Sequence, residues 1–88
     1  MDIIIILVGN RTETAVKVQE ILTSYGDIIR TRLGLNREMA TGDGGTGLIF
    51  LELCGEEQKI KDLCKALNEI EHIKAECIRM ELPNSCAG

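Results

Sequence analysis

One short turn in the sequence is suited to binding an anion, Gly9-Asn10-Arg11-Thr12. It lies between an apolar run and the start of an expected helix, where free backbone N–H groups and the helix dipole attract negative charge. Arg11 could add a bidentate, charge-assisted hydrogen bond to a carboxylate or phosphate. Ordinary helix capping by Asn10 or Thr12, with Arg11 in solvent, explains the same residues. The sequence alone leaves both interpretations open.

Arg30 and Arg32 are two residues apart in an expected strand, so we expect their side chains on one face. With Arg37 they could bind an anion or pair with acidic residues of a neighbouring subunit. Charged residues on an edge strand also discourage aggregation, which needs no ligand. The predicted ligand-binding residues are Gly9, Asn10, Arg11, Thr12, Arg30 and Arg32.

No residue pattern indicates catalysis. We find no Ser/His/Asp, Cys/His or paired-carboxylate constellation, and therefore predict no catalytic residues and a protein that is not an enzyme. The glycine-rich stretch 41–47 lacks the lysine of a P-loop and leads into a strand, so it favours a hairpin connection. His72 is the single histidine and could join a metal site only if another subunit supplied a cysteine.

Four cysteines are present without a CxxC pair, so neither a zinc knuckle nor a redox motif is indicated. Cys54, Cys64 and Cys77 fall within apolar patterns, and we expect them to be small buried hydrophobes. Cys86 lies in an expected tail. We predict no cofactor and no metal, with a metal site built from cysteine and histidine of several subunits as an alternative.

Two similar halves position these residues, because a strand–helix–strand order occurs twice. The expected elements are strand 3–8, helix 11–25, strand 27–35, a glycine-rich loop 36–46, strand 47–54, helix 56–71 and strand 73–82. Two such split units predict an α+β, ferredoxin-like βαββαβ sandwich, a four-stranded antiparallel sheet with two helices on one face. The chain of 88 residues is then one domain, 1–82, followed by a short tail, 83–88.

The chain is 44% hydrophobic, yet it has one Phe, one Tyr and no Trp. The aliphatic residues gather in the two expected central strands, which are apolar on both faces, whereas the helices cover only one. Either Ile3, Ile5 and Leu7 or the alternate set must therefore face away from the helices. Soluble monomers rarely expose such a surface, so we predict a homodimer or homotetramer, joined sheet on sheet or by edge extension. The predicted interface residues are Ile3, Ile4, Ile5, Ile6, Leu48 and Phe50.

Several partners are disfavoured. The net charge is −4 and the basic residues form only a small cluster within 11–37, which is not typical of a nucleic-acid binder. Phe50 is the lone aromatic residue of the central strands, so base stacking on the sheet is not indicated. The apolar run 3–8 is far shorter than the ~20 residues that span a bilayer. Because no signal peptide is indicated, we predict a cytoplasmic protein that does not bind membranes.

Four segments, in this order, carry a family resemblance: Val8-Gly9-Asn10-Arg11, the helix end 21–26, the strand 28–34 and the strand 48–53. With the second amphipathic helix, they resemble a family of small bacterial proteins described as iron-only hydrogenase system regulators. The resemblance covers residues 3–82. This family is similar to the ACT-like, C-terminal regulatory domain of the nickel-responsive repressor, without its DNA-binding segment.

The resemblance implies an oligomeric ACT-like domain that senses a small-molecule effector or binds a protein partner. In ACT domains effectors bind near the first strand–helix turn, at subunit interfaces, and Gly9–Thr12 is the matching position. Any effect on transcription would act through a partner. Nickel sensing is not implied, because the repressor uses several histidines and this chain has only His72. An acylphosphatase-like enzyme is an alternative of another class, although its glycine-rich phosphate cradle is missing from residues 8–12.

Overall fold

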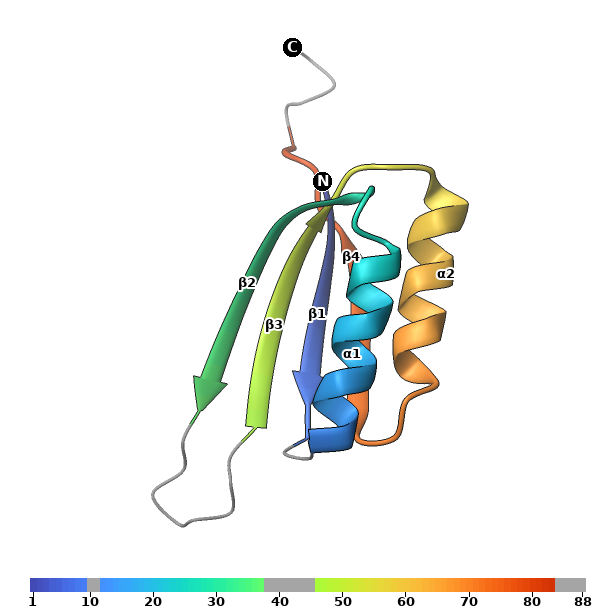
Figure 1. Ribbon diagram of the computed structural model, residues 1–88. Coiled ribbons are helices and arrows are strands. Elements are labelled where there is room, and N and C mark those ends of the chain that lie inside the picture. Colours follow the sequence, from blue (N-terminus) through green and yellow to red (C-terminus); the bar gives the residue numbers. More distant parts are fainter. Residues whose placement is uncertain (10–11, 38–45, 84–88) are drawn as a thin grey trace.

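The computed structural model describes residues 1–9, 12–37 and 46–83, and it contains the predicted elements in the predicted order (Figure 1). They are β1 (Asp2–Val8), α1 (Thr12–Ser24), β2 (Ile29–Arg37), β3 (Thr46–Leu53), α2 (Glu57–Asn68) and β4 (Ile73–Arg79). Most of the predicted loop 36–46 and of the predicted tail 83–88 lies outside the described residues. No helix of the described chain is long and apolar enough to cross a membrane.

The four strands form one antiparallel sheet in the order β2-β3-β1-β4, and both helices lie on the same side of it (Figure 1). The α+β, ferredoxin-like βαββαβ fold is therefore confirmed. As the sequence predicts, β1 and β3 are the central strands. Ile, Val and Leu dominate them because branched side chains pack well on a pleated surface that is covered.

Each helix forms where apolar residues recur at helical spacing. In α2, the buried residues Ile60, Leu63 and Leu67 line one side, while Glu57 in the first turn and Lys65 in the last suit the helix dipole. In α1, Val18 and Leu22 are buried one turn apart. Both helices therefore turn one apolar stripe toward the sheet.

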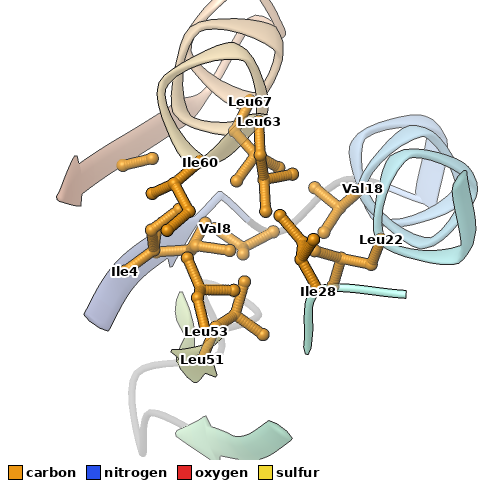
Figure 2. Packing of buried hydrophobic residues seen from close by; sticks show 12 residues of the cluster. Ile4, Val8, Val18, Leu22, Ile28, Leu51, Leu53, Ile60, Leu63 and Leu67 are labelled. Carbon is orange, nitrogen blue, oxygen red and sulfur yellow. The ribbon is translucent and has the colours of Figure 1, made fainter. Parts of the chain in front are cut away.

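The hydrophobic core lies between the sheet and the helices. Figure 2 shows side chains from both helices, including Val18 and Leu63, converging on Ile4 and Val8 of β1. Ile4 and Ile6 are 0% exposed. The prediction that these two residues belong to an interface is wrong, because the helices already cover them. Consequently the alternate set, Ile3, Ile5 and Leu7, faces away from the helices.

A β-bulge interrupts β2 between Ile29 and Thr31. Ile29 stands opposite Leu53 and packs against the core, whereas Thr31 stands opposite Glu52, on the other side of the sheet. Arg30 is the additional residue of this bulge. Its two-residue spacing to Arg32 therefore no longer implies a shared face.

The edge strand β4 is covered at its middle by a side chain of α2. The Asn68 side chain donates to the Ala75 carbonyl oxygen (2.9 Å) and accepts from the Ala75 N–H (2.8 Å). These two backbone groups would otherwise be available to another strand. Asn68 thus blocks strand addition at β4, and β2 is the opposite edge of the sheet.

The end of β1 is held against the start of β4 by close backbone packing. The Gly9 N–H donates to the His72 carbonyl oxygen at 2.8 Å, and a Cβ on Gly9 would lie 2.9 Å from the His72 Cβ. His72 has φ 66°, a left-handed conformation that is uncommon for a residue with a side chain. Only glycine fits beside it at this distance.

We expect Gly9→Ala and Gly34→Ala to change stability in opposite directions. Gly9→Ala should lower the free energy of unfolding by about 1 kcal/mol or more, because the added methyl overlaps His72. At Gly34 an added Cβ would meet nothing within 4 Å. Alanine there should therefore raise the free energy of unfolding by about 0.4–1 kcal/mol, because it lowers the conformational entropy of the unfolded chain. Urea denaturation of both variants measures this, and equal losses would contradict the packing described for Gly9.

Candidate functional site

A groove lies between α1 and the neighbouring strands β2 and β3, on the helix side of the sheet. Its volume is about 230 Å³, and its lining includes Ala15 and Gln19 of α1, Arg32 and Gly34 of β2, and Gly47 and Ile49 of β3. Figure 1 shows the cause, since both helices lie toward β1 and β4 while β2 is at the far edge. Gly34 has no side chain to occupy the groove, and the position that its Cβ would take is surrounded by open space, with no other atom within 4 Å.

Arg32 supplies the positive charge of this groove. Its guanidinium donates a hydrogen bond to the Gln19 Oε1 atom, which is a neutral acceptor. The ion pairs among the described residues are Lys59–Asp27, Lys61–Glu57 and Arg79–Asp2, so within that part of the chain Arg32 faces no carboxylate. A carboxylate ligand would replace a neutral acceptor by a charged one and could accept two parallel N–H bonds.

The structure separates the predicted ligand-binding residues. Arg32 lines the groove, while Gly9 lines a different hollow of about 380 Å³ together with His72 and Lys74. Arg30 is exposed at the bulge and Thr12 begins α1. Asn10 and Arg11 lie outside the described residues, so the turn that the sequence singled out is placed only at its two ends.

Sequence reasoning missed two contributors to the groove. Gln19 is the partner of Arg32, but the two residues are 13 positions apart, and only the packing of α1 over the sheet brings them together. Gly34 had a usable signal, because it follows Arg32 by two residues in a strand and therefore shares its face. A glycine within a strand usually weakens the strand, but beside a cationic residue on the same face it also indicates space that a ligand could occupy.

The cysteines do not form a metal centre within the described chain, where no group of three or more metal-ligating side chains occurs. The expectation that all three strand and helix cysteines are buried is wrong: Cys54 and Cys77 are exposed and Cys64 is half-buried. Cys54 follows the end of β3, and Cys77 lies on an edge strand, so neither has neighbours on every side.

Two of these thiols resist ionisation. Burial raises the pKa of Cys64, and its thiol donates weakly to the Ala75 carbonyl oxygen at 3.8 Å. Although Cys77 is largely exposed, partial desolvation of its thiol raises the pKa of Cys77, with a further contribution from the Asp2 carboxylate. Both thiols are therefore protonated at neutral pH, whereas metals and electrophiles react with the thiolate.

We expect Cys64 to be alkylated more slowly than free cysteine at pH 8. The measurement uses a variant with Cys54→Ser, Cys77→Ser and Cys86→Ser, and follows iodoacetamide consumption as pH rises. Its apparent pKa should exceed the ordinary thiol value of 9.0, and the same variant in urea should return to that value. A folded-state pKa below 9.0 would contradict the role given to burial.

The sheet order and the two helices on one side define the class, a ferredoxin-like α+β domain. A sequence profile of the TM1266-like family, whose proposed role is that of an iron-only hydrogenase system regulator, matches residues 1–77. The chain therefore belongs to the TM1266-like family. No curated protein matches it.

Solved structures agree on the fold. The uncharacterized protein TM1266 from Thermotoga maritima superposes with a TM-score of 0.79 at 22% identity, covering 91% of this chain and 95% of that one. A formyltetrahydrofolate deformylase from Pseudomonas putida KT2440 gives 0.60 at 11% identity, over 90% of this chain and 28% of the deformylase. The de novo designed protein Foldit4 gives 0.58 at 13% identity, over 92% and 100%. At these identities the likeness concerns the fold alone.

Proposed function

We propose that this protein is a small regulatory module that associates with itself and responds to an anionic small-molecule effector. Membership of the TM1266-like family supports the regulatory role. The observation that carries the effector is Arg32, a groove-lining guanidinium whose hydrogen-bond partner is the neutral side chain of Gln19. An effector that bound there would change contacts of both α1 and β2.

The size and lining of the groove limit the effector. A volume of about 230 Å³ is below the range of about 300–1,000 Å³ typical of drug-sized ligands, so a molecule of amino-acid size fits. Ala15, Val18 and Ile49 give an apolar wall beside the guanidinium. We therefore propose a carboxylate with a short apolar body. The bond to Gln19 and a bond to a carboxylate both use the charged guanidinium, but a carboxylate adds an opposite charge and can accept two parallel N–H bonds, so the exchange favours the carboxylate.

Self-association follows from the sheet face that the helices leave open. Leu7, Leu33 and Leu35 are 49%, 54% and 43% exposed, and by register all three lie on that face. A contiguous apolar surface of this kind marks an interaction site. The alternative mode, extension of the sheet at an edge, is restricted to β2 because Asn68 occupies the middle of β4.

The output of the module passes to a protein partner under this proposal. The net charge of −4 favours a protein target over nucleic acid. Effector binding between α1 and β2 would alter the surface that such a partner contacts. Cytoplasmic location is part of the same proposal, since the regulated system and the effector would meet the protein there.

A thermal-shift screen of small carboxylic and amino acids tests the effector site. For a carboxylate that stabilises the wild type, we expect Arg32→Ala to weaken binding about 10- to 100-fold, as the loss of a charge-assisted bond predicts. Gln19→Ala should keep or improve binding, because it removes the competing acceptor.

Arg30→Ala is the matched control, because Arg30 is exposed on the same strand but does not line the groove. Isothermal titration gives the dissociation constants of all variants. If Arg32→Ala binds the stabilising carboxylate as well as the wild type, the groove is not the effector site.

A further inference from the structure

The strand registers arrange the open face of the sheet into cross-strand rows. We call the first the leucine row, with members Leu35, Leu48, Leu7 and Lys74 on β2, β3, β1 and β4. We call the second the phenylalanine row, with members Leu33, Phe50, Ile5 and Glu76. Each row is apolar across three strands and ends in one charge on β4. The two charges have opposite sign.

The next row along the strands marks the end of this apolar area. It consists of Thr31, Glu52, Ile3 and Ile78. The Thr31 hydroxyl donates to Glu52 Oε1 at 2.9 Å, so the polar groups at this position satisfy one another within the chain. The leucine and phenylalanine rows are therefore the apolar centre of the open face.

We propose that this face is the interface of a homodimer in which the leucine row of each copy packs on the phenylalanine row of the other. The inference rests on the proposal that the protein associates with itself, and it names the surface and the geometry. The two-fold axis lies between the two sheets and runs across the strands, midway between the two rows. Leucine, isoleucine and phenylalanine side chains then meet only apolar neighbours. Because β4 of one copy lies over β4 of the other, the two Lys74–Glu76 pairs lie side by side along the β4 edge of the interface.

The charges select this axis over the other simple choice. A two-fold axis parallel to the strands would place β4 of one copy over β2 of the other, with Lys74 against a leucine and Glu76 against another. Burying a charge against an apolar side chain without a partner is costly. An axis across the strands leaves no such mismatch, and sheets packed in this way keep their strands within about 30° of each other.

A hollow at the meeting of the two rows fits the same arrangement. Its volume is about 270 Å³, and all its lining residues belong to the two rows: Ile5, Leu7, Leu48, Lys74 and Glu76. It is open in the single chain, and a side chain of the second copy would fill it. Close packing at the centre of an interface requires shape complementarity, with hollows of one copy filled by side chains of the other.

Charge reversal tests the geometry. Lys74→Glu or Glu76→Lys alone creates two like-charge contacts per dimer, and we expect each to raise the dimer dissociation constant about tenfold or more at low salt. The double variant, Lys74→Glu with Glu76→Lys, exchanges the charges and should return to within about threefold of the wild type. Sedimentation velocity over a concentration series measures the constants.

Leu33→Lys tests the apolar part of the surface, and it should abolish the dimer. Val16→Lys is its matched control, since Val16 on α1 is 50% exposed and Leu33 is 54% exposed, but Val16 lies on the other side of the molecule. Urea denaturation confirms that each variant folds.

A wild-type protein that stays monomeric up to about 1 mM would overturn both this inference and the proposed self-association. A dimer that is insensitive to the single charge reversals, or that the double variant does not restore, would overturn the interface while leaving self-association and the effector site standing. Loss of the dimer in Val16→Lys but not in Leu33→Lys would place the contact on α1 and also overturn the inference.

Discussion

One constraint governs this structure: the central strands β1 and β3 are apolar on both faces of the sheet, but the two helices cover only one of these faces. Ile4, Ile6 and Leu51 are buried beneath the helices, with at most 1% exposure. Their alternating neighbours, among them Ile5, Leu7 and Phe50, are just as apolar and face the other way. The described residues, 1–9, 12–37 and 46–83, form no third layer over that face. In the proposed dimer, a second copy of the chain buries that face.

The same coverage explains where a small molecule can bind. Because both helices pack toward β1 and β4, the strand β2 extends beyond them on the helix side. Gly34 then leaves space where another residue would fill it, and Arg32 reaches back to Gln19 on α1. The groove and the open face are on opposite sides of β2 and β3. A ligand in the groove would therefore touch the strands that carry one end of both apolar rows. Under the proposed function, these shared strands would couple effector binding to assembly.

The fold could be predicted from the sequence because its signals are local. The apolar runs, the helical spacing of Val18 and Leu22, and the breaks at Gly9, Gly26 and Gly55 each specify one element, and repetition of the order specifies the topology. The orientation of β1 could not be predicted, because Ile occupies both faces and either alternate set satisfies the pattern. The candidate site was predicted in part. Arg32 could be predicted from its charge, but Gln19 could not, because only tertiary packing brings it to Arg32. The expected shared face of Arg30 and Arg32 was not predictable either, because the bulge at Ile29–Thr31 interrupts the alternation of the strand.

The central claim, that the open face is covered in solution, is tested most directly by solvent accessibility of single methyl groups. Methyl-labelled protein is exposed to a soluble paramagnetic agent, and the relaxation of Leu7 and Leu33 is compared with that of Val16. In the isolated chain these three side chains have similar exposure, 49%, 54% and 50%. The account predicts that Leu7 and Leu33 are protected in concentrated protein and become accessible on dilution, while Val16 is accessible throughout. Equal and concentration-independent relaxation of all three would contradict it.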